Sequence, residues 1–176
     1  ARRIRGMILH CVRPAAEGGE TSLLDPELLY IALRDESPAL VRALQHPQAM
    51  TIPARDDESG VARPAQSGPV FETVQGRLHL RYTARTRSIE WRDDPLTGTA
   101  VERLAALLAD DRLGVLRTTL QAGSGLVGHN VLHERSAFRD DPAAPRLLYR
   151  ARYLDRIVSA EEDAWSREGS PAWPNG

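Results

Sequence analysis

Residues 123–150 constrain the fold more than any other part of this sequence. Three closely spaced glycines lead into an apolar run rich in branched side chains, which ends at His133 and is typical of a β-strand. A polar turn with two prolines follows, and a second apolar run starts at Arg146. Because proline interrupts helices, the stretch predicts two neighbouring strands joined by a turn.

The second of these strands carries arginines at a regular spacing. Side chains alternate between the two faces of a strand, so Arg146, Leu148 and Arg150 are expected on one face. His133, which could bind a metal, ends the preceding strand. A possible metal ligand followed by two guanidinium groups that point the same way is suited to holding a small anion beside a metal.

Composition narrows the class of protein. The 176 residues carry a formal net charge of -1, whereas nucleic-acid binding needs a basic surface, so we expect no nucleic-acid partner. No apolar span approaches the ~20 residues of a transmembrane helix, so we expect no membrane partner. The single cysteine, Cys11, fits a reducing, cytoplasmic setting. All 23 basic residues are arginine, which excludes chemistry that needs a lysine amine.

The rest of the chain predicts short helices among strands. We expect a mixed α/β, β-dominated fold, with a curved antiparallel sheet or jelly roll that carries helical insertions. Ser37 is a candidate helix cap, and Thr99 begins a capping-box pattern. The expected elements are strands at 4–12 and 115–121, helices at 25–35, 38–45 and 99–109, an exposed loop at 54–68, and a hairpin of 69–74 with 77–85.

Two motifs in the central stretch need weighing. Residues 123–128 match G-x-G-x-x-G, but they run into a β-rich segment and not into a helix, which disfavours dinucleotide binding. His129 and His133 stand four residues apart. On a strand they would be ~13 Å apart at ~3.3 Å per residue, so at most one of them is a ligand. His133 also fits a partly buried histidine whose hydrogen bonds are satisfied.

Structural roles are open for the other polar candidates. Arg146 and Arg150 could form salt bridges with Asp140, Asp141 or Glu134, although an arginine inside an apolar strand is costly without an anion. Thr21 follows two glycines and could be a turn residue with a locally bonded hydroxyl. A further group of residues fits either a solvated strand face or substrate contacts: His79, Arg81 and Arg85.

Three segments together carry a family resemblance. The turn at 18–21, the sequence Asn-Val-Leu-His at 130–133 and the pattern Arg-x-x-x-Arg at 146–150 resemble the taurine-dioxygenase-like (TauD/TfdA) family. The resemblance implies an iron(II)- and 2-oxoglutarate-dependent oxygenase on a double-stranded β-helix. It implies a domain over 1–158, and we expect 159–176 to be a frayed tail.

The resemblance also implies roles for individual residues. His133 matches the distal histidine of a 2-His-1-carboxylate iron site. Arg146 matches the arginine that pairs with the far carboxylate of 2-oxoglutarate, and Thr21 the threonine that assists it. Arg150 matches a position that in some members meets an anionic substrate. The implied cofactors are Fe(II) and 2-oxoglutarate, and the implied partner is a small anionic molecule. Assembly into a homo-oligomer is a further possibility.

One departure from the family pattern divides the functional hypotheses. The family's other two iron ligands form a His-x-Asp/Glu motif shortly before the Gly-Gly turn, and none of the five histidines here is followed two places later by Asp or Glu. We expect the chain to be the C-terminal part of a longer enzyme, incomplete at its N-terminus. The alternative is a non-catalytic homologue that lost the metal and acts as a binding or scaffolding module. A β-helix that lacks its first strands exposes unpaired strand edges, so we expect such a fragment to be poorly soluble or to self-associate.

Overall fold

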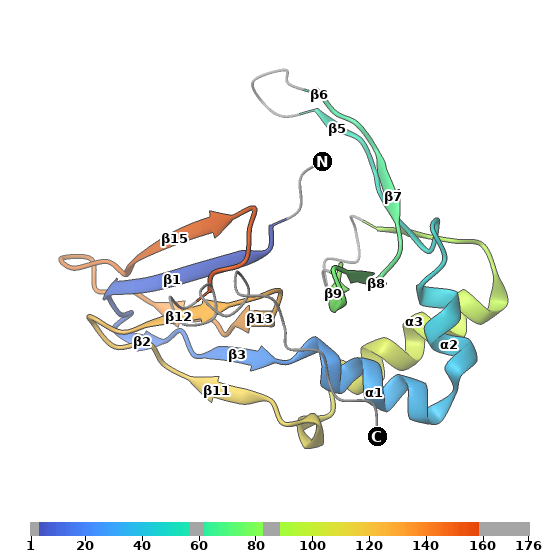
Figure 1. Ribbon diagram of the computed structural model, residues 1–176. Helices are drawn as coiled ribbons and strands as arrows, with labels where there is room; N and C mark the ends of the chain where they lie inside the picture. The colour runs from blue at the N-terminus through green and yellow to red at the C-terminus, as the bar shows by residue number, and fades with distance from the viewer. Residues whose placement is uncertain (1–3, 57–61, 83–88, 159–176) are drawn as a thin grey trace, which may run out of the picture. The chain divides into compact units, whose positions relative to one another are not determined.

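The computed structural model describes residues 4–56, 62–82 and 89–158. The described chain divides into two compact units. Unit 1 contains residues 4–19, 119–130 and 137–158, and unit 2 contains 20–56, 62–82, 89–118 and 131–136. Helices and strands of both units are labelled in Figure 1.

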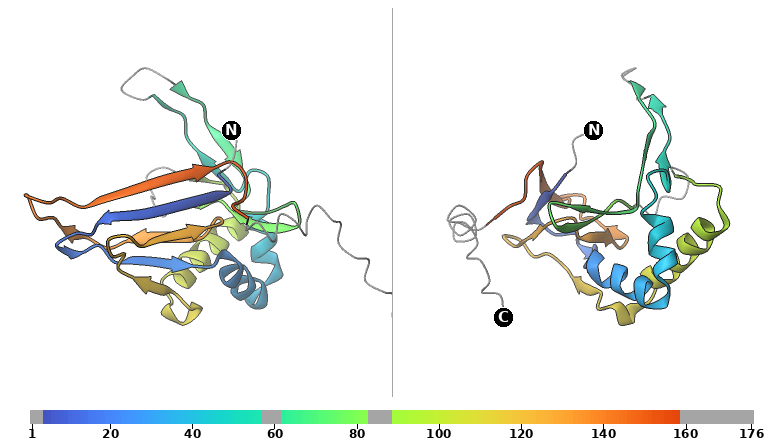
Figure 2. Two further views of the ribbon diagram at one scale, coloured as in Figure 1. Left: turned by 60° about the vertical axis from the view of Figure 1, so that its left-hand side comes forward. Right: turned by 45° about the vertical axis from the view of Figure 1, so that its right-hand side comes forward.

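Unit 1 is built on an antiparallel three-stranded sheet in the order β12-β1-β15. The long central strand β1 runs between the other two, as Figures 1 and 2 show. The register shifts between Cys11 and Arg13, which marks a bulge. A short pair, β2 with β14, belongs to the same unit. The strands are β1 (Gly6–Arg13), β2 (Glu17–Gly18), β12 (Gly125–Gly128), β14 (Phe138–Arg139) and β15 (Leu147–Tyr153).

Unit 2 contains the three α-helices of the described residues, and each begins with a proline in its first turn. Asp25 and Asp94 cap two of them, because their carboxylates accept backbone N–H groups of Glu27 and Thr97. Ser37 stands at the N-cap of the remaining helix, α2, and makes no side-chain cap bond. The helices are α1 (Pro26–Glu36), α2 (Pro38–Leu44) and α3 (Pro95–Leu108), followed by a 3-10 turn, Asp111–Leu113.

The strands of unit 2 form several small antiparallel sheets. Two of these sheets have three strands, in the orders β11-β3-β13 and β10-β4-β7, and two are pairs, β5 with β6 and β8 with β9. The strands are β3 (Thr21–Leu24), β4 (Met50–Ile52), β5 (Arg55–Asp56), β6 (Ala62–Arg63), β7 (Gln66–Gly68), β8 (Phe71–Val74), β9 (Arg77–Leu80), β10 (Glu90–Trp91), β11 (Leu116–Thr118) and β13 (Leu132–Arg135).

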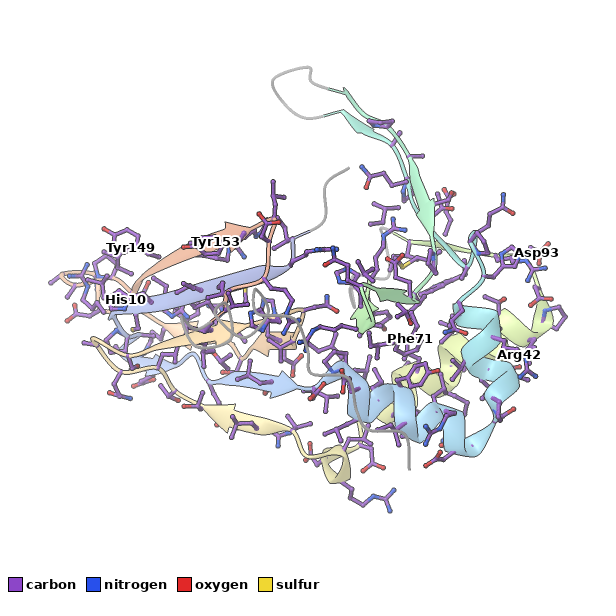
Figure 3. All side chains as sticks on the ribbon, viewed as in Figure 1. His10, Arg42, Phe71, Asp93, Tyr149 and Tyr153 are labelled. Atoms are coloured by element: carbon purple, nitrogen blue, oxygen red, sulfur yellow. The ribbon has the colours of Figure 1, made fainter. Side chains whose placement is uncertain are left out.

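The hydrophobic core of unit 2 lies between its helices and the β8–β9 hairpin. Phe71 is fully buried and meets the Tyr30 ring edge-on, with centroids 5.4 Å apart. The labelled Phe71 side chain is visible among the helical side chains in Figure 3. The buried cluster consists of Leu29, Leu33, Leu40, Val41, Ala43, Leu44, Ala49, Met50, Val70, Phe71, Leu80, Ala100, Leu104 and Leu107.

Most of the predicted elements are present, with several corrections. The expected loop at 54–68 contains β5, β6 and β7. The capping box at Thr99 is wrong, because α3 begins at Pro95 and the Thr99 hydroxyl bonds back to the Pro95 carbonyl. The first strand predicted in 123–150 is two strands, β12 and β13, since Asn130 has a φ of 61°. The expected tail at 159–176 lies outside the described residues.

The architecture confirms a mixed, strand-rich fold with helical insertions. Among the described strands no sheet closes on itself, so a complete β-helix is not seen in this part of the chain. None of the described helices has the length and apolar character needed to cross a membrane.

Candidate functional site

The residues singled out from the sequence fall in both units. Thr21 and His133 belong to unit 2, whereas Arg146 and Arg150 belong to unit 1. The environment of each residue is therefore described within its own unit.

Thr21 begins strand β3 and is one of two buried polar residues in the described chain. It stands opposite Arg135 on β13 and Thr118 on β11. Its side chain is 4% exposed, and its hydroxyl makes no hydrogen bond within the described residues. The prediction of a turn residue with a locally bonded hydroxyl is therefore wrong, because the strand pairs on both sides and encloses the side chain.

His133 lies on β13 opposite Leu23, two residues along the strand from the Arg135–Thr21 pair. Directly opposed residues share a face, and so do alternate residues of a strand, so Thr21 and His133 lie on the same face of this sheet. The imidazole is exposed, and its Nδ1 atom is 3.2 Å from the Val131 carbonyl oxygen. A carbonyl only accepts, so Nδ1–H is the donor in this contact, and in the neutral ring the lone pair is then on Nε2.

His129 does not share a strand with His133, because the chain turns at Asn130 between them. The backbone N–H of Ile157 donates to His129 Nε2 at 3.1 Å. The guanidinium of Arg156 lies 3.0 Å from the Nδ1 atom. The ring thus contacts residues 156 and 157 of its own unit, and this indicates a structural role for the histidine.

Arg146 immediately precedes β15, at the end of the Asp140–Pro145 turn. Its guanidinium carbon lies 5.2 Å from the centre of the Phe138 ring, a cation–π contact. The Nε atom passes Gly19, where an added Cβ would lie only 3.8 Å away. The buried glycine and the aromatic ring together hold the side chain partly buried. The arginine is thus positioned by packing.

The salt bridges that are the structural alternative for Arg146 and Arg150 do not form among the described residues. The Asp140 carboxylate accepts the backbone N–H of Arg146 at 2.9 Å, and the Asp141 carboxylate accepts that of Ala143 at 2.8 Å. Both acids therefore stabilise the turn. No carboxylate of the described chain pairs with the guanidinium of Arg146 or with that of Arg150. These cations are available to an anion from outside the described residues.

Comparison with known proteins decides the family. The profile described as "Taurine catabolism dioxygenase TauD, TfdA family" matches residues 2–152, most of the chain. The chain belongs to this family. It is 32% identical over 158 residues to a protein named uridine-5'-phosphate dioxygenase from Streptomyces sp, covering 84% of this chain and 55% of the relative. A protein of the same name from Amycolatopsis sp is 33% identical over 162 residues, covering 86% and 56%.

Solved structures support the fold of this TauD/TfdA-family chain. Asparagine oxygenase in complex with Fe(II), 2S,3S-3-hydroxyasparagine and succinate matches with a TM-score of 0.60 at 20% identity, over 85% of this chain and 45% of that one. The non-heme iron oxygenase OrfP in complex with Fe and alpha-ketoglutaric acid matches with a TM-score of 0.61 at 19% identity, over 85% and 44%. The TauD/TfdA-family chain thus spans about half the length of the relatives it matches.

The described residues do not by themselves fit the iron that the family implies. No three His, Cys, Asp or Glu side chains in the described chain lie close enough together to hold a metal ion. His133 is therefore part of no such three-residue group. The described part of the TauD/TfdA chain therefore does not supply a complete set of three ligands.

Sequence reasoning misses several neighbours of the candidate residues. Phe138, which stacks on Arg146, carries no sequence signal because the contact crosses a turn. Arg117 in β11 pairs with Asp111, and this hydrogen bond, with the attraction of the same carboxylate, raises the arginine's pKa.

The sequence does not decide whether Arg81 faces solvent or contacts substrate. Its guanidinium donates to the Gln66 carbonyl at 2.5 Å, which gives it a structural contact, and Arg85 lies outside the described residues.

Proposed function

We propose that this chain is part of an iron(II)- and 2-oxoglutarate-dependent dioxygenase that hydroxylates a small anionic substrate. The observation that carries the proposal is the guanidinium of Arg146. It is partly buried, oriented by Phe138 and Gly19, and without a carboxylate partner in the described chain. Burying an unpaired cation is unfavourable, so an arginine prepared in this way favours binding of an anion.

Arg146 would bind the far carboxylate of 2-oxoglutarate. A planar guanidinium opposite a carboxylate makes two parallel charge-assisted hydrogen bonds, which fix orientation as well as position. The family resemblance implies that a threonine hydroxyl assists this arginine, and Thr21 is the residue that matches it. Neither residue needs to exchange a proton, so their part is binding and orientation.

His133 would bind the iron through Nε2. The contact from Nδ1 to the Val131 carbonyl supports this, because metal-binding histidines commonly donate their other ring N–H to an acceptor that fixes the ring. Bound iron would supply the oxygen chemistry of the family. The proposal requires that the other two iron ligands come from outside the described residues, since these contain no three-ligand group.

The substrate we propose is a nucleoside 5′-phosphate such as uridine 5′-phosphate. The two relatives named uridine-5'-phosphate dioxygenase support this choice at 32% and 33% identity. The unpaired Arg150 on β15 supports an anionic group on the substrate. The double-stranded β-helix, completed by strands outside this chain, is the architecture that the proposal assumes.

The test measures succinate formation and cosubstrate binding in the protein that contains this chain. Arg146→Gln should weaken the binding of 2-oxoglutarate about a hundredfold, in both Kd and KM, because two charge-assisted hydrogen bonds are lost. His133→Ala should abolish iron-dependent turnover. Arg139→Gln is the matched control in unit 1, since Arg139 pairs with Glu17, and it should change neither constant.

The same experiment separates the enzyme from the non-catalytic alternative. Binding of 2-oxoglutarate that depends on Arg146, without succinate formation in the presence of iron, would show a dicarboxylate-binding module. Turnover that is unchanged in both variants would refute the roles assigned to Arg146 and His133.

A further inference from the structure

The arginines of the described chain differ in whether a carboxylate meets them. Several surface arginines form ion pairs within their own unit: Arg34 with Asp35, Arg92 with Asp94, Arg103 with Glu36, Arg112 with Asp110, Arg117 with Asp111, and Arg139 with Glu17. On β15, Arg150 and Arg152 have no such partner among the residues the structure describes, although both are exposed. This strand therefore carries two uncompensated positive charges.

The register places these two charges side by side. Arg150 stands opposite Leu9 and Arg152 opposite Met7 on the neighbouring strand β1. Residues two apart on a strand project from the same face, with their Cα atoms ~7 Å apart. Along this face the two arginines follow Leu148, which stands opposite the buried Cys11. The residues of β1 that stand opposite this face are all apolar: Met7, Leu9 and Cys11.

We propose that Arg150 and Arg152 form a two-arginine clamp for a phosphate monoester. A phosphate monoester carries a charge of about −1.5 to −2 near pH 7 and offers three acceptor oxygens. One guanidinium leaves much of this charge uncompensated, whereas two guanidinium groups on the same face match both the charge and the number of acceptors. The proposal rests on the proposed function, and it adds Arg152 as a specificity-determining residue for the 5′-phosphate of the substrate.

A structural explanation competes with the clamp. β15 is an edge strand among the described strands of its sheet, and charged side chains on edge strands prevent pairing with other chains. Edge protection requires positive charge, but it requires neither a ligand nor the planar guanidinium that donates two parallel hydrogen bonds. An arginine-to-lysine substitution, which keeps the charge and removes the guanidinium, therefore distinguishes phosphate binding from edge protection.

The experiment measures ligand binding by calorimetry at low and high salt. The probes are uridine 5′-phosphate, uridine and inorganic phosphate, and the variants are Arg150→Gln, Arg152→Gln and Arg152→Lys. Arg42→Gln in α2 is the control, because Arg42 is exposed and has no carboxylate partner in the described chain. Arg42 is labelled in Figure 3, and its removal changes the net charge equally.

The clamp predicts a specific pattern of losses. Each glutamine variant should weaken uridine 5′-phosphate binding about tenfold, the lysine variant should recover only part of this loss, and the binding of uridine should not change. Added salt should weaken nucleotide binding in the unsubstituted protein more than in the glutamine variants. Loss of inorganic phosphate binding along with the nucleotide would show that the phosphate group alone is recognised.

Failure of the clamp and failure of the proposed function give different results. If turnover occurs with uridine 5′-phosphate but the KM for this nucleotide is the same in Arg152→Gln and Arg42→Gln, the clamp is wrong and the oxygenase stands. If no turnover occurs and nucleotide binding still depends on Arg150 and Arg152, the clamp stands and the oxygenase is wrong. Self-association of Arg152→Gln with unchanged nucleotide binding would establish edge protection instead and overturn the clamp.

Discussion

The two units of this chain keep their shape by different means. Unit 2 contains the whole of the buried core cluster, packed around three helices and a hairpin. In the described part of unit 1, the only buried hydrophobic residues are Cys11 and Leu120, while Val127 and Tyr149 are 63% and 62% exposed. Unit 2 is thus stabilised mainly by side-chain burial, and unit 1 mainly by backbone pairing of its strands. This difference predicts which substitutions each unit tolerates.

The largest effect should come from removing a core side chain of unit 2. Phe71→Ala deletes a fully buried ring and its edge contact with Tyr30, so the free energy of unfolding should fall by about 3–5 kcal/mol. Tyr149→Ala removes an aromatic ring of unit 1 from a mostly exposed position and should change it by less than about 0.5 kcal/mol. Urea unfolding followed by circular dichroism measures both. Comparable losses would show that the exposed face of unit 1 is covered in solution.

In unit 1, an added methyl group should cost more than a removed side chain. A Cβ at Gly125 would overlap the Leu9 carbonyl oxygen, and one at Gly18, where φ is 70°, would overlap that of Ala137. Because both obstacles are backbone, Gly125→Ala and Gly18→Ala should each destabilise by about 1–3 kcal/mol. Hydrogen exchange should accelerate at Cys11, whose N–H bonds to Ser124 beside β12.

Val127→Ala is the matched control for the glycine substitutions. Val127 lies on the same strand as Gly125 and pairs with Ile8, but it is 63% exposed. Its truncation should leave exchange at Cys11 unchanged. If Val127→Ala opened the sheet as much as Gly125→Ala, side-chain packing would be holding unit 1 together after all.

A smaller effect should separate two helix caps of unit 2. The Asp94 carboxylate accepts both the N–H and the hydroxyl of Thr97, at 3.0 and 2.8 Å. Asp94→Ala should therefore lose the stability that a helix N-cap contributes and lower the denaturation midpoint. Ser37→Ala should be nearly neutral, because Ser37 makes no side-chain cap bond. The comparison of the two denaturation midpoints is the measurement, and a larger loss for Ser37→Ala would contradict it.

The elements predicted best from the sequence are those whose signals are local. Asp25 before Pro26 correctly predicts where α1 begins, and the hairpin around Gln75 and Gly76 is confirmed, with both residues at positive φ. The capping-box pattern at Thr99 places the start of α3 too late, because Asp94 before a proline is the stronger signal.

Other features depend on contacts that a sequence pattern does not contain. Asn130 interrupts an otherwise continuous apolar run by adopting the left-handed conformation, which its short polar side chain tolerates. Asp140 and Asp141 look like partners for Arg146 because they are near in sequence. Whether a carboxylate caps a turn or meets a guanidinium is decided by the fold of that turn, so the unpaired state of Arg146 is visible only in the structure. The roles of His133 and Thr21 in binding remain predictions.

The smallest predicted effect concerns acid, and it should act on unit 2. The side-chain hydrogen bond from Arg112, with its backbone N–H, lowers the pKa of Asp110 from 3.8 to about 2. A lowered carboxyl pKa gives stability that is fully present above pH 3.8 and is lost as the pH falls towards 2. The effect is small because Arg112 is 90% exposed. Two other carboxyl groups of unit 2 also have lowered pKa values. A hydrogen bond from Arg103 lowers that of Glu36, and hydrogen bonds from Thr97 lower that of Asp94.

Asp110→Asn tests this acid dependence against a matched control. The variant should be slightly less stable at neutral pH, and its loss of stability between about pH 4 and 2 should be shallower, since one carboxylate no longer takes up a proton on unfolding. Asp93→Asn is the control, because Asp93 is exposed and makes no hydrogen bond within the described residues; its position is labelled in Figure 3. Urea midpoints measured across this pH range, with exchange at amides of α3 reporting on unit 2, provide the readout. Identical pH profiles for Asp110→Asn and the unsubstituted protein would show that the Arg112 contact does not persist in solution. The acid sensitivity of unit 2 would then rest on Asp94 and Glu36.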